Sequence, residues 1–284
     1  MDAKTILTEA LETRWKKFRN ELKHCRDEFS EEAVHDLRVA TRRLLAIFEL
    51  LRAIMPHNRI QKVRRELKDQ LDDLDDLRDT QTLLADVSED LKEHPQLKIF
   101  QKYLLKEEKR FLRSTRKLIQ AREYKNLNKR VQKIHAVAQT LVPEMLGGQM
   151  IAAADEAFSH VIQTYFAMDA ENPASIHKLR IAFKKFRYTL EIIHPLLSNF
   201  PDANFERMHN YQAKMGEIQD MQVASQRAAD LDTTPASPAV IEAVSAHYAL
   251  CLRTAVINYL EDKGEVLVFW RTSPDQPFPW EKSS

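Results

Sequence analysis

The chain has 284 residues, of which 44% are hydrophobic and 30% are charged, and 43 lysines and arginines balance 42 aspartates and glutamates. This is the composition of a soluble protein with room for about two domains, and it excludes a uniformly basic nucleic-acid coat. Only four glycines and two cysteines are present. Their scarcity excludes glycine-rich phosphate loops, cysteine-rich zinc sites and a disulfide scaffold.

Apolar residues at helical spacing, punctuated by prolines, predict helices along nearly the whole chain. The first two are expected at 2–29 and at 31–55, the second with Ser30 as its N-cap. A third helix is expected at 58–92, with a break near 78–80, and two more within 96–142, broken near 121–124. The segment 143–148 is predicted to be the main boundary of the chain. Further helices are expected at 150–169, 174–198, 203–230 and 238–262.

The last residues, 265–284, are rich in proline and aromatic side chains. We interpret them as a strap that packs on the chain's own helices, with the docking of a partner protein by residues 266–270 as the alternative. The N-terminus shows no signal peptide, and no apolar run reaches about 18–20 residues. We therefore expect a cytoplasmic protein that does not associate with membranes.

The near-zero net charge is the sum of two opposite patches. Residues 101–133 carry twelve lysines and arginines against three glutamates, whereas residues 69–79 carry six aspartates against one arginine. These patches indicate that local charge, and not net charge, decides what the protein binds.

The strongest signal is an internal repeat. The segment VHDLRVATRRL at residues 34–44 is matched by IHKLRIAFKKF at residues 176–186, so that His35 aligns with His177 and Arg38 with Arg180. A second match joins LDDLRD at residues 74–79 with MGEIQD at residues 215–220. The two halves are therefore predicted to be two copies of one helical unit, which meet near Gly147.

On a helix, the repeated residues separate into an apolar stripe and a column of cationic side chains beside it. One column consists of His35, Arg38 and Arg42, and the other consists of His177, Arg180 and Lys184. Three such side chains one turn apart repel one another, and partial burial makes this worse unless an anion is present. The columns thus predict a basic cleft for a polyanion, built twice.

Two other interpretations of the columns stay open. Glu49, Glu191 or the aspartate run could neutralise the cations within the protein, and each histidine could be a neutral hydrogen-bond donor that fixes a neighbour. In the polyanion interpretation, bound phosphates would favour the charged form of His35 and His177, since histidine titrates near neutrality. Binding would then tighten at mildly acidic pH.

These segments resemble the CHAD family, the conserved-histidine α-helical domain. The second copy carries the resemblance through IHKLRIAFKKFRYTLE and MGEIQDMQV, and the first copy through VHDLRVATRRL and LDDLRDTQTLL. The resemblance covers about residues 5–262 and implies an all-α fold of two tandem helical-bundle repeats, related by pseudo-two-fold symmetry around a central basic cavity. We place the first repeat at 1–146, the second at 149–264 and the tail at 265–284.

The resemblance also implies non-catalytic binding of inorganic polyphosphate, a linear polyanion, with no cofactor or metal, and association with polyphosphate granules. Carried over by position, it assigns the walls of the cavity to His35, Arg38, Arg42, Arg43, His177, Arg180, Lys184, Lys185, Arg187 and Tyr188. Rows of cations elsewhere add Arg65, Lys68 and Arg113 as candidates. The two copies differ at Tyr188, which is matched by Ala46, and at Gly216, which is matched by Asp75.

The acidic segment offers a competing chemistry. DDLDD at residues 72–76 satisfies the DDxxD pattern with which some all-helical enzymes hold Mg²⁺ on a diphosphate. A metal-dependent (di)phosphate enzyme that uses residues 72–79 is therefore an alternative function. The second copy has no such cluster, which favours the interpretation of these aspartates as counter-charges for basic helices.

Nucleic acid is the other polyanion to consider, and a general polyanion or nucleic-acid binder is the second alternative. Proteins that bind single strands interleave aromatic side chains with cations so that bases can stack. Residues 35–46 contain no aromatic side chain. This pattern favours a ligand that has phosphates but no bases.

Overall fold

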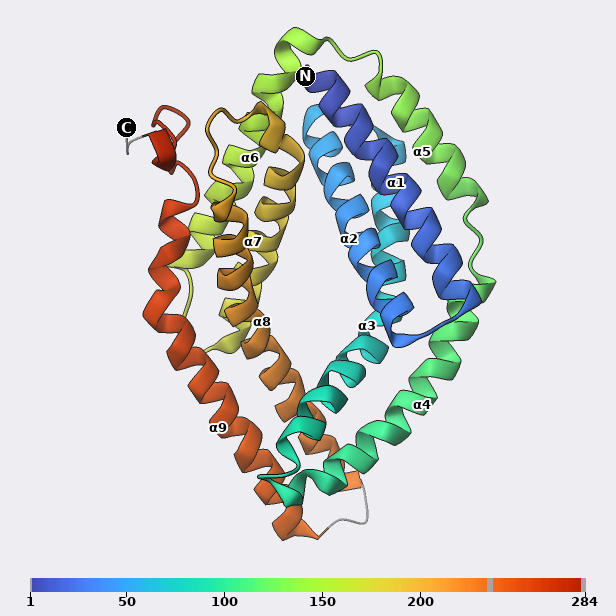
Figure 1. The fold of residues 1–284 in the computed structure, drawn as a ribbon, viewed down its shortest axis with the longest axis vertical. Helices are drawn as coiled ribbons and strands as arrows, with labels where there is room; N and C mark the ends of the chain where they lie inside the picture. The colour runs from blue at the N-terminus through green and yellow to red at the C-terminus, as the bar shows by residue number, and fades with distance from the viewer. Residues whose placement is uncertain (1, 234–236, 282–284) are drawn as a thin grey trace.

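The computed structural model describes residues 2–233 and 237–281, which contain helices and no strand (Figure 1). The expected all-helical class is confirmed. The helices are α1 (Ala3–Asp27), α2 (Glu31–Ile54), α3 (Asn58–Asp90), α4 (Lys98–Ala121), α5 (Lys125–Ala138), α6 (Pro143–Phe166), α7 (Pro173–Ile193), α8 (Ala203–Ala229) and α9 (Pro238–Asp262). Short 3-10 turns follow α3, α7, α8 and α9 at Pro95–Leu97, His194–Leu196, Asp230–Thr233 and Lys263–Val268, and another lies at Pro279–Glu281.

Side chains cap the N-terminal ends of several helices, and the predicted cap at Ser30 is confirmed. The Ser30 hydroxyl accepts a hydrogen bond from the Ala33 amide at 3.1 Å, which caps α2. Asn172 caps α7 in the same way, through the Ala174 amide. The predicted break near 121–124 is confirmed, because α4 ends at Ala121 and α5 begins at Lys125.

Two predicted boundaries are wrong. No break occurs near 78–80, because α3 continues through this stretch and buries Leu74, Leu77 and Thr80 on one face. The segment 143–148 is not a linker but the first turns of α6. Pro143 fits the first helical position, where no amide hydrogen is needed, and Gly147 faces Ala3 of α1, where a Cβ would make an ordinary contact at 3.7 Å.

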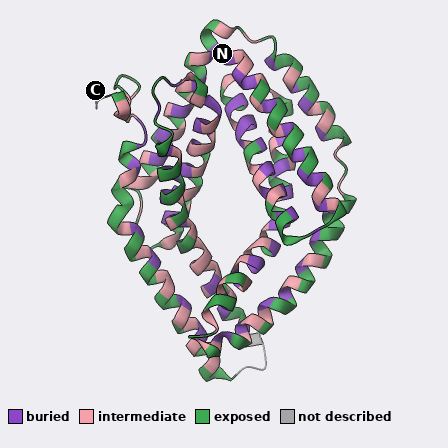
Figure 2. Cartoon of the chain, in the orientation of Figure 1, coloured by how far each residue is buried: buried purple, intermediate pink, exposed green. Residues whose placement is uncertain are grey.

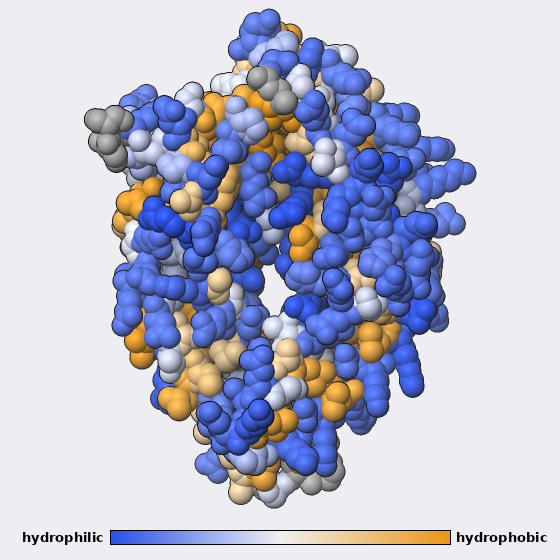
Figure 3. Space-filling model, in the orientation of Figure 1, coloured by the Kyte–Doolittle hydropathy of each residue, from blue (hydrophilic) through white to orange (hydrophobic). Residues whose placement is uncertain are grey.

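The helices form two arms that meet at both ends (Figure 1). At one end α2 packs against α6 and α7, within the larger hydrophobic core. At the other end α3, α4, α8 and α9 share a second, smaller core that includes Phe100 and Tyr248. Buried residues lie along the inner faces of the helices at these two ends (Figure 2), and the space-filling view shows an opening between the arms, bordered mainly by hydrophilic residues (Figure 3).

The C-terminal tail packs on the protein's own helices, which confirms the strap interpretation for residues 265–281. Phe269 and Trp270 are fully buried and contact the rings of Phe183 and Phe186 on α7. The Trp270 indole donates a hydrogen bond of 2.8 Å to Asp155 on α6. Arg271 holds the same carboxylate with two further hydrogen bonds, of 2.9 and 2.6 Å. Residues 282–284 of the predicted tail lie outside the described part of the chain.

One segment, Pro238–Val268, is long and apolar enough to cross a membrane, judged by length and composition alone. It contains α9, which packs along α8 and buries Tyr248 and Tyr259. Leu250 and Ile257 on its outer side are exposed. The expectation that the protein does not associate with membranes therefore stays a prediction.

Candidate anion-binding cavity

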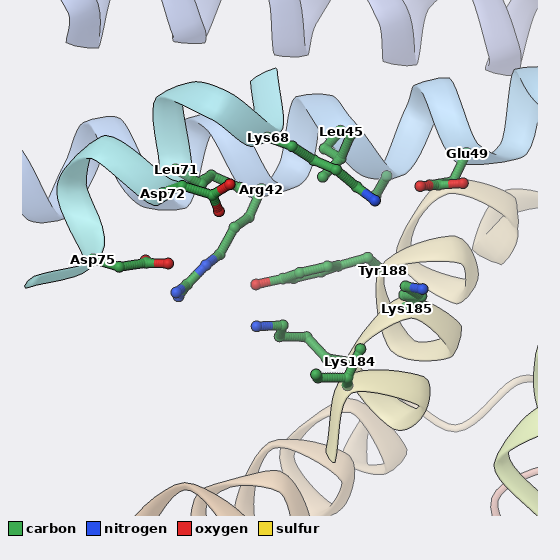
Figure 4. A pocket seen from close by; sticks show the side chains of 12 residues that line it. Arg42, Leu45, Glu49, Lys68, Leu71, Asp72, Asp75, Lys184, Lys185 and Tyr188 are labelled. Carbon is green, nitrogen blue, oxygen red and sulfur yellow. The ribbon is translucent and has the colours of Figure 1, made fainter. Parts of the chain in front are cut away.

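A cavity of about 470 Å³ lies between α2 and α3 on one side and α7 on the other (Figure 4). One cation from each column, Arg42 from the first and Lys184 from the second, therefore faces the same space. Five of the sequence-predicted residues line the cavity, namely Arg42, Lys68, Lys184, Lys185 and Tyr188. Its other lining residues are Leu45, Ala46, Glu49, Leu71, Asp72, Asp75 and Ile181.

Arg38 is neutralised within the protein. It is 4% exposed, and its Nη1 atom donates hydrogen bonds to the Asp75 carboxylate and, at 3.3 Å, to the Leu71 carbonyl. Both acceptors belong to α3, which packs against α2. For this residue the interpretation of the aspartate run as a counter-charge is confirmed.

Arg180, the counterpart of Arg38, has no such partner. Gly216 stands where Asp75 stands in the first half, and a Cβ placed on it would lie 3.7 Å from Arg180 Nε and 3.8 Å from Nη2. Arg180 Nε is buried and has no hydrogen-bond partner among the described residues. The same register thus places a carboxylate beside one arginine and a glycine beside the other.

Arg42 and Lys184 carry the strongest electrostatic perturbation in the cavity. Burial, together with Arg38 and Arg180, lowers the pKa of Arg42. Burial and the positive charges of Arg42, Arg180 and Arg38 lower the pKa of Lys184 to about 7, against a weak opposing effect of Asp75. Figure 4 shows the ends of Arg42, Lys184 and Tyr188 pointing toward one another. The ligand-free cavity is therefore a place where positive charge is under-compensated.

The two histidines lie beside this cluster and do not line the cavity. Burial and the charge of Arg78 lower the pKa of His35. Burial and the charge of Arg180 lower the pKa of His177, while hydrogen bonding to Gln219 acts in the opposite direction. Both rings therefore favour the neutral form at pH 7 in the free protein. His177 Nδ1 is buried and lacks a hydrogen-bond partner in the described structure.

Arg43 and Arg187, which the sequence also assigns to the site, do not line the cavity. They flank Glu191, at 4.0 Å from Arg43 Nε and 3.9 Å from Arg187 Nε. Arg187 also contacts His209 and lies over the Tyr188 ring. Arg65 is exposed on α3, and Arg113 is exposed on α4. Neither of these two lines the cavity.

The acidic segment serves the fold through ion pairs. Besides the contact of Asp75 with Arg38, Asp73 pairs with Arg122 at 2.5 Å and Asp76 pairs with Arg227 at 2.8 Å. Arg122 follows α4, and Arg227 lies on α8. Within the described ranges, no group of three or more histidine, cysteine, aspartate or glutamate side chains is arranged to hold a metal ion. Glu49, a suspected counter-charge of the column, pairs with Arg64 and Arg52 instead.

Two acids lie near the arginines of the columns, of which the sequence analysis included Asp79 in the aspartate run but missed Asp220. Asp79 and Asp220 occupy matched positions at the ends of LDDLRD and MGEIQD. Burial raises the pKa of Asp220 to about 6, although Arg180 opposes the shift. Burial also raises the pKa of Asp79, and Arg38 opposes that shift in turn. The repeated final aspartate of the two motifs was the signal that could have placed each acid near an arginine of the columns.

The fold and the position of the repeated arginines invite comparison with known proteins. A profile of the CHAD domain matches residues 9–229, which is most of the chain. The chain belongs to the CHAD domain family. No curated protein sequence matches it significantly.

Two solved structures share the CHAD fold. The crystal structure of the CHAD domain from the plant Ricinus communis is 15% identical, with a TM-score of 0.69, over 90% of this chain and 93% of that one. PptA from Streptomyces chartreusis is 16% identical, with a TM-score of 0.73, over 94% of this chain and 99% of that one. At these identities the likeness is one of fold.

Proposed function

We propose that this CHAD domain protein binds inorganic polyphosphate in the cavity between α2, α3 and α7, and that it does not turn the polymer over. The observation that carries the proposal is the convergence of Arg42, Arg180 and Lys184, which come from both halves of the chain and form no ion pair with a carboxylate in the part of the structure described. Buried positive charge of this kind destabilises the folded protein unless an anion binds beside it.

The shape and lining of the cavity favour phosphates without bases. Arginine binds phosphate oxygens in a forked geometry, and lysine adds a point charge. Tyr188 is the one aromatic side chain among the lining residues, on a wall that otherwise consists of aliphatic and charged groups. A nucleic-acid strand would need more surfaces on which bases can stack. These features support polyphosphate over single-stranded nucleic acid.

We also propose that the two halves are copies of one helical unit, with each copy giving one helix of cations to the cavity. Support comes from two contacts that occupy equivalent positions in the two halves. Arg38 lies beside Asp75, and Arg180, which aligns with Arg38, lies beside Gly216, which aligns with Asp75. The interpretation as two copies explains why the cavity combines α2 with α7, because these helices carry the repeated segment.

The proposal is tested by titrating the purified protein with long-chain polyphosphate at two salt concentrations, beside pyrophosphate and single-stranded DNA of equal charge, while free phosphate is monitored. We expect binding of the polymer alone, weakened strongly by salt because counterions are released, and no release of phosphate. Equal binding of DNA would indicate a general polyanion cleft. Release of phosphate would indicate an enzyme.

The pKa of Lys184 predicts a pH dependence of binding. In the free protein this pKa is about 7, so at pH 8.5 the amine is mostly neutral, and a bound polyanion that favours the charged form must bring a proton with it. Affinity should therefore rise by up to about tenfold per unit as pH falls from 8.5 to 7.5. The Lys184→Arg variant keeps its charge and should lose this dependence. Calorimetry in two buffers of different ionisation enthalpy measures the proton uptake, and binding with no uptake in that range would contradict the prediction.

The contrast between Asp75 and Gly216 predicts how one added carboxylate beside Arg180 would change the affinity for polyphosphate. Gly216→Asp should give Arg180 the counter-charge that Arg38 already has, and should weaken polyphosphate binding about tenfold. Gly216→Ala is the control, since a Cβ makes only ordinary contacts there and alanine favours the helix. If Gly216→Asp bound as tightly as Gly216→Ala, Arg180 would not be a ligand.

A further inference from the structure

Lys184 is a lysine inside a cavity and forms no ion pair with a carboxylate in the described structure. α7 directs its side chain toward the Arg42 guanidinium and the Tyr188 hydroxyl, which come from opposite walls (Figure 4). No hydrogen bond or ion pair joins Lys184 to another residue of the described structure, whereas Lys17 and Lys214 on the surface each pair with an acid. The amine is therefore not engaged in holding the fold together.

The groups that face Lys184 come from three helices. Arg38 and Arg42 come from α2, Asp75 from α3 and Arg180 from α7. The remaining titratable groups of the wall are Glu49, Lys68, Asp72, Lys185 and Tyr188. Burial and the surrounding guanidinium groups lower the pKa of Lys184 to about 7. At pH 7 about half of this side chain is then a free amine, against roughly one part in 2,500 for an exposed lysine.

A free amine next to a site for phosphate favours one class of reagent. An acyl phosphate joins a phosphoryl group, which the guanidinium groups attract, to a carbonyl carbon that an amine attacks. The cavity, at about 470 Å³, has room for a small one. We propose that Lys184 is an acylation site for small acyl phosphates, which bind by the phosphoryl group beside Arg42 and present the carbonyl carbon to the lysine amine. This inference rests on the proposed function, in that it needs the cavity to bind phosphates.

The reaction needs no metal, oxidant or further reactant. The lone pair of Lys184 Nζ attacks the carbonyl carbon, and a carbon–nitrogen bond forms. The bond between that carbon and the bridging phosphate oxygen breaks, inorganic phosphate leaves with the electron pair, and the amine loses a proton to water. The product is an amide that stays neutral at every pH. Acylation thus removes one cation from the cavity, and the acylated protein should bind polyphosphate less tightly.

The test is to incubate the full-length protein with acetyl phosphate at pH 7 and to follow each lysine by peptide mass spectrometry. Lys184 should be acetylated at least about tenfold faster than the exposed Lys178 of the same helix, which lies outside the cavity wall. An N-hydroxysuccinimide ester of acetate, which carries no phosphate, separates reactivity from phosphate recognition. In Arg42→Gln, the rate with acetyl phosphate relative to the rate with the ester should fall at Lys184.

Polyphosphate added before the reagent separates the two proposals. Protection of Lys184 would support both the acylation site and the proposed ligand. Rapid acetylation of Lys184 without protection would support the acylation site and count against polyphosphate as the ligand of this cavity. Acetylation of Lys184 no faster than that of Lys178 would overturn the acylation site, even where polyphosphate binds.

Discussion

Replacing Arg42 and Arg180 together by glutamine should weaken the binding of long-chain polyphosphate by about 100-fold to 10,000-fold. These are the two arginines of the columns that form no ion pair with a carboxylate in the described ranges, so their charges are available to a ligand. A hydrogen bond to a charged group contributes about 1.5–3 kcal/mol, and two such contacts give the range stated. Equilibrium titration at fixed salt measures the loss.

The fold should survive this double substitution, since glutamine is shorter and removes two charges that burial disfavours. Circular dichroism should show unchanged helicity. The matched control is Lys62→Gln with Lys178→Gln, which removes two exposed cations from α3 and α7 outside the cavity wall. If both doubles lost affinity equally, binding would depend on net charge, and the cavity would not be the site.

Replacing Lys184 by methionine should make the protein more stable while it makes polyphosphate binding weaker. The pKa of Lys184 falls from its ordinary value of 10.5 to about 7 in the folded protein, so the folded state disfavours the charged form. Below pH 7 both folded and unfolded chains carry the proton, and the folded state is destabilised by on the order of 4 kcal/mol. Methionine removes this penalty and keeps a similar length.

Lys184→Met should be stabilising at both low and high pH, but the size of the stabilisation should depend on pH. Between pH 7 and about pH 10 the folded protein carries the neutral amine while the unfolded chain still binds the proton, so stability rises with pH and little of the penalty is left near pH 10. The melting temperature of Lys184→Met should exceed that of the wild type by several degrees at pH 6.5 and by little at pH 10. Lys178→Met, on the exposed side of α7, should show no such gain. An equal gain in the control would mean that burial of Lys184 does not oppose folding.

The fold could be predicted from periodicity because helix formation and helix capping are local. Ser30 and Asn172 cap helices through their own side chains, and apolar spacing marks the buried faces. The wrong boundaries arose where tertiary packing decides. Residues 78–80 stay helical within α3, where Leu77 and Thr80 are buried against neighbouring helices, and Gly147 lies inside α6 and not in a turn.

The cations of the site could be predicted from the sequence because their spacing along one helix is a local property, but their partners could not. The columns of cations follow from the spacing on one helix, and Arg42, Lys184 and Tyr188 indeed reach one cavity. Whether a cation is neutralised depends on the helix that packs opposite. The difference between Asp75 and Gly216 is visible in the sequence, but its effect on Arg38 and Arg180 requires the register of α3 against α2 and of α8 against α7.

The match to the CHAD family and the buried core of the protein end at different residues, because the C-terminal tail is part of the core. The CHAD profile ends at residue 229, yet the rings of Phe183 and Phe186 are covered by Phe269 and Trp270, and Tyr211 shares a hydrogen bond of 2.9 Å with Tyr259 of α9. A fragment cut at the profile boundary would expose aromatic side chains on the back of the helix whose front carries Lys184. The smallest autonomous fragment is therefore longer than the shared domain, and it extends through the C-terminal aromatic residues.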